Sequence, residues 1–280
     1  YNIGIWLWEL DEFPDDWCKF FSLYDEIWTP STFNTNSIKQ KSPIPVRTVP
    51  YGITAQYNEK FDRNYFNLPN DKFLFLSMYD VKSTIARKNP LGAIQAFKKA
   101  FNSYDMNVGM VIKVNNASQD DLNELNNYIG EYKNIYLMPK ILSKVEVNSL
   151  IKCCDVFVSL HRSEGFGLVL AEAMYLGVPC IATNWSANTD FMNNETSCLV
   201  DYSLIDVNDE YYLAGFKGKK APKWADPNID TASRFMIKLA NDKQFYNTLS
   251  QKGEQYIKKN YSISKSSEKI VEILKSLNLI

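Results

Sequence analysis

Short apolar runs alternate with longer amphipathic segments between residues 73 and 183. The short runs predict buried strands, and the longer segments, whose apolar residues recur at helical spacing, predict helices. We expect strands at Phe73–Ser77, Val108–Val114, Ile135–Met138, Val156–Leu160 and Cys180–Thr183. We expect helices at Pro90–Phe101, Gln119–Tyr132, Lys144–Lys152 and Leu168–Leu176. This alternation predicts an α/β fold with a doubly wound, Rossmann-like parallel sheet, which binds ligands at the carboxyl ends of its strands.

The first 66 residues do not fit inside that sheet and predict a second, smaller unit. We expect its strands at Asn2–Glu9, Asp25–Trp28 and Pro45–Val49, and a helix at Asp16–Leu23. Pro50 and Gly52 favour a linker after the last of these strands. Towards the other end of the chain, the segment Lys265–Leu277 predicts a further helix.

Composition narrows the classes of function that the chain can have. The 280 residues are 45% hydrophobic, which suffices for one large core or two moderate ones. A net charge of −1 gives no general attraction to nucleic acid or to anionic lipid. No apolar run approaches the roughly 20 residues that a membrane span needs. The five cysteines are irregularly spaced, so we expect a reduced, cytoplasmic compartment.

The segment 163–174 carries the most informative chemistry. It places Glu164 before the turn Gly165–Gly167, and Glu172 follows eight residues after Glu164. This turn joins a predicted strand to a predicted helix, where backbone N–H groups and the helix dipole favour an anion. Its glycines would let a ligand approach the backbone closely. At about 1.5 Å per residue the carboxylates would stand roughly 12 Å apart, about the length of a sugar–diphosphate–ribose. Taken alone, two glutamates at this spacing are more often surface residues beside an ordinary glycine turn.

The spacing of Glu164 and Glu172 resembles the E-x7-E motif of the retaining GT-B glycosyltransferases of family 4, also called the group 1 glycosyltransferases. The resemblance continues through Gly177–Thr183, Arg87–Pro90 and Trp224–Pro227 and spans essentially the whole chain. It implies three parts. Residues 67–262 are expected to form the C-terminal domain, which binds the nucleotide-sugar donor. Residues 1–66 would be the last third of the N-terminal acceptor domain, most of which is then absent from this chain. Residues 263–280 would be a helix that crosses back to that domain.

The same resemblance implies roles for charged residues. Glu164 is expected to meet hydroxyls of the donor sugar, and Glu172 the ribose hydroxyls. Lys88 matches a lysine that binds the donor diphosphate, where a cation stabilises the leaving group. The alternative for Arg87 and Lys88 is a solvated basic pair. Many relatives carry an arginine right after the first strand of this domain, where this chain has Met78-Tyr79-Asp80, and Arg87 is the candidate replacement.

Backbone groups and loops complete the expected donor site. We expect N–H groups that face the sugar and phosphates from Gly165, Phe166, Gly167 and Leu168. The loop that contains Lys140 and Ile141 stands where the family holds the base, largely through backbone contacts. Trp185 is expected to wall the sugar pocket.

Three further positions leave alternatives open. His161 is the only histidine of the chain and could be a general base, or it could wall or support the pocket. The second role is favoured because the family is understood to pass the acceptor proton to the leaving phosphate. Arg162 is expected to steady the carboxylates or the phosphates. Glu9 either takes the place of a histidine that faces the donor sugar in relatives, or is an exposed strand-end residue.

Two sequence features concern structure and metal chemistry. Trp224–Asn228 predicts the start of a helix and marks a subfamily. No cluster of His, Cys and Asp has metal-ligand spacing, so we expect no metal cofactor.

The sequence therefore predicts a glycosyltransferase that moves a hexose from a nucleotide-sugar to a glycan or lipid-linked glycan in bacterial polysaccharide synthesis. GDP-mannose is the favoured donor, because Arg87–Pro90 and Ser163–Gly165 resemble mannosyl- and rhamnosyltransferases. The protein would be cytoplasmic or peripheral to the inner face of the plasma membrane, with no nucleic-acid partner. The alternatives are a GT-B nucleotide-sugar epimerase, for which one histidine is a poor acid/base set, and a non-catalytic nucleotide-sugar-binding module.

The N-terminal tryptophans suggest an exposed apolar face. They are Trp6, Trp8, Trp17 and Trp28. A complete domain would bury most of them, so we expect this chain to self-associate or to bind a partner chain, and to be a poor catalyst alone.

Overall fold

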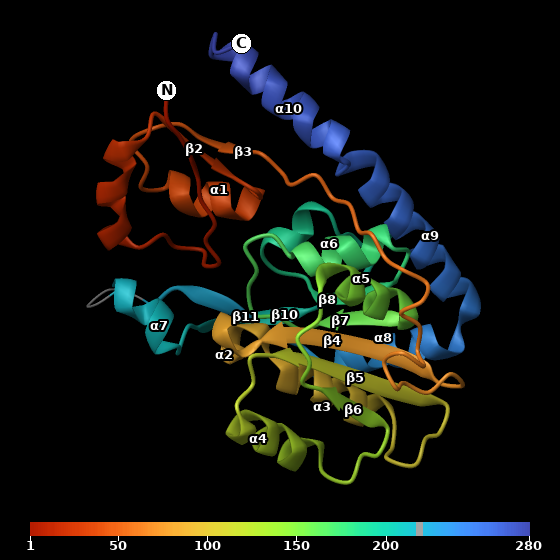
Figure 1. Ribbon diagram of the computed structural model, residues 1–280. Coiled ribbons are helices and arrows are strands. Elements are labelled where there is room, and N and C mark those ends of the chain that lie inside the picture. Colours follow the sequence, from red (N-terminus) through yellow and green to blue (C-terminus); the bar gives the residue numbers. More distant parts are fainter. Residues whose placement is uncertain (217–220) are drawn as a thin grey trace.

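Two parallel sheets form the framework of the computed structural model, which describes residues 1–216 and 221–280 (Figure 1). The larger sheet has the strand order β6-β5-β4-β7-β8-β9, and every neighbouring pair is parallel. Its strands are β4 (Phe73–Asp80), β5 (Val108–Asn115), β6 (Ile135–Met138), β7 (Val156–Ser159), β8 (Cys180–Thr183) and β9 (Cys198–Val200). The strand order reverses between β4 and β7, and this is where an open α/β sheet leaves a crevice for ligands. The predicted doubly wound sheet is confirmed.

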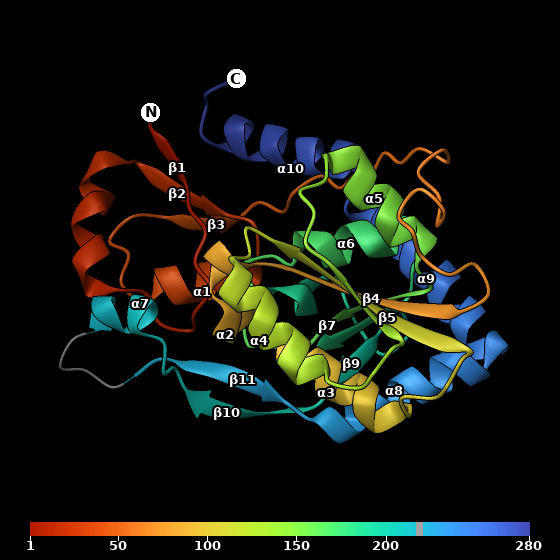
Figure 2. The ribbon, with the colours of Figure 1, turned by 60° about the horizontal axis from the view of Figure 1, so that its bottom comes forward.

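Helices cover both faces of the larger sheet (Figure 2). One face carries α5 (Lys144–Cys153) and α6 (Leu168–Tyr175), and the other carries α3 (Pro90–Ala100), α4 (Gln119–Ile129) and α8 (Ile229–Asn241). Alternate residues of β4 enter the two cores: Leu74 and Leu76 face α5 and α6, whereas Phe75 faces α3. Helices α4 and α5 begin with capping boxes at Ser118 and Ser143, which satisfy free N–H groups of the first turn.

The smaller sheet belongs to the N-terminal unit, by which we mean residues 1–48. Its strands β1 (Ile3–Ile5), β2 (Glu26–Thr29) and β3 (Val46–Thr48) are parallel and lie in that order. The first strand is shorter than predicted, and the helix expected at Asp16–Leu23 is the 3-10 helix η1 (Asp15–Leu23). Helix α1 (Thr32–Lys39) was not predicted; it is capped by Ser31, whose hydroxyl accepts a hydrogen bond from the Asn34 N–H.

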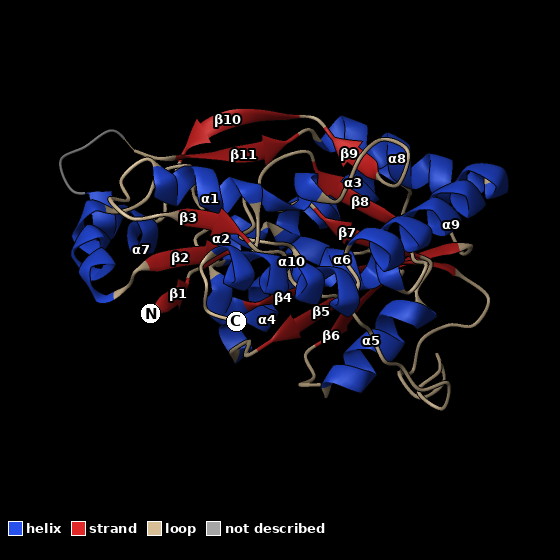
Figure 3. Ribbon diagram, turned by 90° about the horizontal axis from the view of Figure 1, so that it is seen from above, coloured by secondary structure: helices blue, strands red, loops and turns tan. Residues whose placement is uncertain are grey.

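A hairpin arm, residues 202–216 and 221–227, projects from the larger sheet to the N-terminal unit (Figure 3). Strands β10 (Tyr202–Asp206) and β11 (Lys223–Pro227) pair in antiparallel fashion, and α7 (Glu210–Leu213) and η4 (Ala214–Phe216) lie at its far end. Three aromatic side chains of the arm join the core of the N-terminal unit: Tyr212, Phe216 and Trp224.

The arm adds a strand that was not predicted. The helix start expected at Trp224–Asn228 is present, because α8 begins after Asn228, whose side chain accepts from the Thr231 N–H, but the residues before Asn228 belong to strand β11. The reason is tertiary, because β11 pairs with β10 and Trp224 is fully buried against the N-terminal unit. Burial of this kind overrides local propensity.

Two more segments connect the units. Helix α9 (Lys243–Asn260) packs on α6, and α10 (Ile263–Ser276) continues to the N-terminal unit, where Ile273 meets Trp28 and Val49 (Figure 1). The segment that connects β3 to β4, residues 49–72, places Ile53 and Phe66 in the core beneath α5 and α6. Domain limits at residues 66 and 262 stay predictions. No helix within the described ranges is long and apolar enough to cross a membrane.

Trp224 should be a major stabilising contact between the arm and the N-terminal unit. We expect Trp224→Ala to lower the free energy of unfolding by about 3–5 kcal/mol, because it leaves a cavity where a fully buried indole stood. Urea denaturation followed by circular dichroism measures this loss. Phe20→Ala is the matched control, since that ring is 43% exposed. Equal losses in both variants would show that the arm does not stabilise the fold.

Candidate functional site

The loop 160–167, between β7 and α6, is held against the N-terminal unit. The Gly165 carbonyl accepts hydrogen bonds from Ser31 Oγ at 2.9 Å and Asn34 Nδ2 at 2.7 Å. The Ser163 hydroxyl donates to the Glu9 carbonyl. The loop lies at the carboxyl end of β7, beside the point where the strand order reverses. This is the place predicted for a ligand.

Glu164 lies in this loop among positive charges. Lys88 Nζ is 2.5 Å from Glu164 Oε1, and Arg87 Nη1 is 3.6 Å from Glu164 Oε2. The carboxylate is 13% exposed. Burial alone would raise the pKa of Glu164, but Lys88 and Arg87 outweigh it and lower the pKa to about 2. Glu164 is therefore an ionised acceptor at neutral pH.

Arg87 is the buried centre of this charged cluster. It lies on α2 (Ile85–Lys88), and Asn89, with φ of 51°, turns the chain from α2 into α3. Besides its contact with Glu164, its guanidinium donates to the Ser163 carbonyl at 2.9 Å. The residue is 3% exposed, so it is not part of a solvated basic pair. A role of Arg87 towards donor phosphates stays a prediction, and Lys88 is the more accessible of the two cations.

Glu9 faces Glu164 across Arg87. Its carboxylate is 3.7 Å from Arg87 Nη2 and 3.4 Å from the hydroxyl of Tyr212, which donates to it. Tyr212 also accepts a hydrogen bond from Arg87. Glu9 therefore lies in the cluster and is not an isolated strand-end residue. The sequence reading missed Tyr212, because only the fold of the arm brings it here.

Glu172 has a cation of its own. Its carboxylate is 4% exposed and lies 2.5 Å from Lys144 Nζ, at the start of α5. Burial raises the pKa of Glu172, and Lys144 partly offsets this rise. The two glutamates thus point to different partners: Glu164 to α2 and Glu172 to α5. Lys144 was not predicted, although a lysine at the start of the helix after the base loop was a usable signal.

The structure assigns a supporting position to His161. The ring is fully buried; Nδ1 accepts from the Ser159 hydroxyl at 3.0 Å, and Nε2 lies 3.0 Å from Asn188 Oδ1 and 3.3 Å from the Trp185 carbonyl. Burial lowers the pKa of His161, so the imidazole is neutral. These contacts favour the supporting role over a general base.

Among the described residues, the side chain of Arg162 contacts Asp226 and α2 and neither of the two glutamates, and its expected role towards the phosphates stays a prediction. Arg162 pairs with Asp226 of the arm at 3.0 Å and donates to the Ala86 carbonyl at 2.6 Å. It therefore ties the arm to α2. Trp185 is half-buried, with Phe33 at 5.7 Å and Tyr202 at 5.3 Å between ring centroids.

Backbone conformation and close packing explain why positions 165 and 167 of the turn are glycine. Gly167 has φ of +85°, a conformation that side chains disfavour. A Cβ at Gly165 would lie 2.8 Å from Cδ1 of Leu7, so this glycine admits the N-terminal unit, where we had expected a ligand. The Phe166 side chain is buried beside Tyr51, whereas Leu168 is 43% exposed. Gly165, Phe166 and Gly167 are therefore buried, and Leu168 is the exposed residue where α6 begins.

The predicted base loop is accessible, and the described part of the chain contains no metal-binding group. Lys140 is exposed, and Ile141 is 81% exposed. Among the described residues, no three His, Cys, Asp or Glu side chains are placed to hold a metal ion. The independence from metal stays a prediction.

Comparison with known proteins identifies the family. The sequence pattern of the family Glycosyl transferases group 1 matches residues 58–208, more than half of the chain. The chain belongs to this family. Lys88, Glu164 and Glu172 of this group 1 protein lie inside the matched range, whereas Glu9 and Tyr212 lie outside it.

Named relatives are similar over part of their length. An Escherichia coli protein named UDP-Gal:alpha-D-GlcNAc-diphosphoundecaprenol alpha-1,3-galactosyltransferase is 27% identical over 128 residues, which are 46% of this chain and 27% of that protein. Anabaena Alr3699/HepE, solved with UDP and glucose, has a TM-score of 0.70 at 14% identity and covers 92% of this chain. A glycosyltransferase from Rickettsia africae has a TM-score of 0.72 at 13% identity and covers 98%. This chain spans 65% of the HepE chain and 70% of the Rickettsia chain. The structural neighbours share the GT-B fold, as predicted.

The ionised state of Glu164 should contribute to stability in a defined pH range. Because its pKa falls from 4.5 to about 2 on folding, the contribution is present above the unfolded value and is lost as pH falls through the folded value. We expect Glu164→Gln to lower the free energy of unfolding near neutral pH by up to about 3 kcal/mol, and by less under acidic conditions. Urea titrations at several pH values measure this difference in the free energy of unfolding, and Glu195→Gln, which changes an exposed glutamate, is the control. A difference that does not change with pH would contradict the charge assignment.

Proposed function

We propose that this group 1 protein transfers a hexosyl group from a nucleotide-sugar to a glycan acceptor, with retention of anomeric configuration. The observation that carries the proposal is the pair Glu164 and Glu172, which flank the first turn of α6 and each face a separate lysine. A nucleotide-sugar has hydroxyls at both ends and two phosphates between them. Glu172 would accept from the ribose hydroxyls and Glu164 from the sugar hydroxyls, with the start of α6 beside the phosphates.

Lys88 and Glu164 neutralise each other at a distance of 2.5 Å between Nζ and Oε1. A donor would replace this contact with two of its own, because its diphosphate attracts Lys88 and its sugar hydroxyls donate to Glu164. Lys88 is thereby placed to stabilise charge on the departing nucleoside diphosphate. In the transfer, the bond from the anomeric carbon to the diphosphate oxygen breaks, and the acceptor hydroxyl oxygen bonds to that carbon on the same face. The acceptor proton passes to the departing phosphate oxygen, a route that leaves buried His161 unused.

A UDP-sugar is the first candidate donor. The support comes from the names of the E. coli galactosyltransferase and of the HepE complexes with UDP and UDP-glucose. GDP-mannose is the second candidate, supported by the resemblance of Arg87–Pro90 and Ser163–Gly165 to mannosyl- and rhamnosyltransferases. The E. coli name also supports a lipid-linked glycan acceptor. We place the reaction in bacterial polysaccharide synthesis, in the cytoplasm or at the inner face of the plasma membrane.

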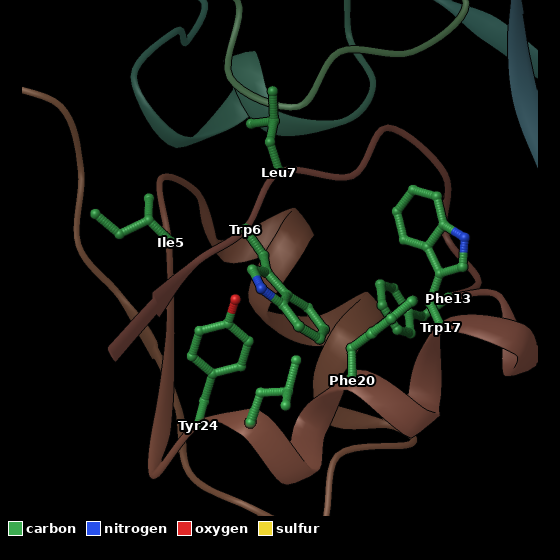
Figure 4. A pocket seen from close by; sticks show the side chains of 8 residues that line it. Ile5, Trp6, Leu7, Phe13, Trp17, Phe20 and Tyr24 are labelled. Carbon is green, nitrogen blue, oxygen red and sulfur yellow. The ribbon is translucent and has the colours of Figure 1, made fainter. Parts of the chain in front are cut away.

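An apolar pocket on the N-terminal unit supports a protein partner (Figure 4). It has a volume of about 380 Å³, and its wall includes Trp6, Phe13 and Phe20. Strand β1 forms an edge of its sheet here, and Ile5 is 73% exposed. Of the four tryptophans, Trp8 and Trp28 are buried, so the exposed face is narrower than the sequence suggested. We propose that a second copy of this chain covers the pocket.

Nucleotide binding tests the phosphate assignment. We expect calorimetry with UDP, and in parallel with GDP, to show binding without added metal. Lys88→Ala should weaken it by about 1–3 kcal/mol, the range for a charge-assisted contact. Lys133→Ala, which changes an exposed lysine elsewhere, should have no effect. A change within about twofold for Lys88→Ala, a small fraction of such a contact, would rule the assignment out.

The two glutamates should separate by ligand. Glu172→Ala should weaken UDP and UDP-glucose alike, because both ligands contain the ribose. Glu164→Ala should leave UDP binding nearly intact and weaken UDP-glucose, since the glucose hydroxyls lose their acceptor. Isothermal titration of both ligands against both variants measures this. Equal weakening of both ligands in Glu164→Ala would refute the division.

Self-association should depend on the apolar pocket. We expect light scattering to show a concentration-dependent dimer that Ile5→Lys disrupts, because a charge would enter an apolar interface. Tyr104→Lys is the control, an exposed apolar side chain distant in sequence from the pocket, 82% exposed. A monodisperse monomer at all concentrations would contradict the proposal. Full transferase turnover by that monomer would also show that catalysis does not require a second chain.

A further inference from the structure

A second cavity lies between the 3-10 helix η1 and the arm. It has a volume of about 320 Å³, and residues from both sides line it: Trp8, Pro14, Asp16, Trp17, Tyr212, Ala214 and Gly215. Figure 3 shows α7 of the arm beside the N-terminal unit, where this cavity forms. All these residues lie outside the range 58–208 that matches the family pattern. The cavity is therefore built by features of this chain that the matched range does not contain.

Its lining combines aromatic rings with a carboxylate. Trp8 meets Trp17 at 5.0 Å and Tyr212 at 5.8 Å between centroids, both edge to face. Trp17 stays 40% exposed. The Asp16 carboxylate is exposed and has no ion pair or side-chain hydrogen bond among the described residues. Aromatic faces suit the C–H face of a sugar ring, and a carboxylate suits its hydroxyls.

This chemistry separates the cavity from the apolar pocket of Figure 4. That pocket shares Trp17 with the cavity, but its other described lining residues include Ile5, Phe20 and Leu23, and none of them carries a carboxylate. In the second cavity, Asp16 would repel an anionic ligand and would lose solvation beneath an apolar protein segment. A neutral, polyhydroxylated ligand satisfies both walls. A volume of about 320 Å³ is at the small end of ligand pockets and fits one or two sugar rings.

Tyr212 connects the cavity to the charged cluster. Its ring lines the cavity, and its hydroxyl is 3.4 Å from Glu9 and accepts from Arg87. Arg87 in turn contacts Glu164. A saccharide in the cavity would thus be separated from Glu164, the carboxylate expected to hold the donor sugar, by the side chains of Tyr212 and Arg87.

We infer that this cavity is a saccharide subsite, which holds a sugar unit of the acceptor glycan remote from the reacting hydroxyl. The inference rests on the proposed transferase function and names where its acceptor is held. Binding of a non-reacting unit would position the reacting hydroxyl opposite the donor, which is how remote contacts accelerate a transfer.

Saturation-transfer NMR with methyl α-glucoside, α-mannoside and α-galactoside tests the subsite on the full chain, together with calorimetry for UDP. We expect at least one glycoside to bind, and Asp16→Ala and Trp17→Ala each to weaken it by about tenfold, the loss of one good contact. UDP binding should not change in either variant. Phe20→Ala is the matched control, because this ring is equally exposed on the same 3-10 helix but lines the other pocket. Since Trp17 packs on Trp8, the exposed Asp16 provides a test that does not depend on folding.

Each other outcome has a defined meaning. If no glycoside binds, or Asp16→Ala binds it like the unchanged chain, the subsite is wrong. If UDP still binds in that case, only the subsite is refuted. If UDP fails to bind as well, the proposed function is also refuted. If Asp16→Ala instead abolishes a dimer and leaves glycoside binding unchanged, the cavity is an interface between copies and the inference is overturned.

Discussion

The buried guanidinium of Arg87 is the contact on which the arrangement of this site depends. It lies between Glu9 of the N-terminal unit and Glu164 of the loop before α6, and it donates to Tyr212 of the arm. Burial works against its charge, but Glu164 and Glu9 outweigh it and raise the pKa of Arg87. Removal of one partner from such a cluster leaves an uncompensated buried charge, which costs about 3–5 kcal/mol. Three segments far apart in the sequence are therefore fixed by one side chain.

Because Arg87 is held by these contacts, the three cations of the site have different roles. Arg87 is engaged with protein groups, so of the two neighbouring cations Lys88, at 22% exposed, is the one more accessible to a diphosphate. Lys144 holds Glu172 at the other side of α6. Among the described residues, the site therefore offers Lys88 near the start of the helix, beside Glu164, and the more exposed Lys144, at 56%, beside Glu172. That order matches the order of groups along a nucleotide-sugar.

Strands β4 to β8 and helices α3 to α6 were predictable because each is a local apolar pattern, whereas β9 at the edge of the larger sheet was not predicted. The smaller helix α1 was missed because it carries few apolar residues and depends on the cap at Ser31. The arm was missed because Trp224 and Tyr212 are buried only against the N-terminal unit, a contact between distant segments. Among site residues, the motif predicted Glu164, Glu172 and Lys88.

What the motif could not supply was the environment of each residue. The burial of His161 and the contact of Gly165 with Leu7 come from tertiary packing. The partner of Arg162 is Asp226, which the arm positions. The sequence predicted candidate site residues, but the side chains that contact them, such as Lys144 beside Glu172, were not predicted.

The central claim is that a nucleotide-sugar lies across the start of α6 between the two glutamates. A crystal structure of the chain with UDP-glucose tests it most directly. We predict the ribose hydroxyls on Glu172, the diphosphate beside Lys88 and the start of α6, and the contact between Lys88 and Glu164 replaced by contacts to the ligand. A nucleotide bound elsewhere, or bound with that ion pair intact at 2.5 Å, would contradict the account.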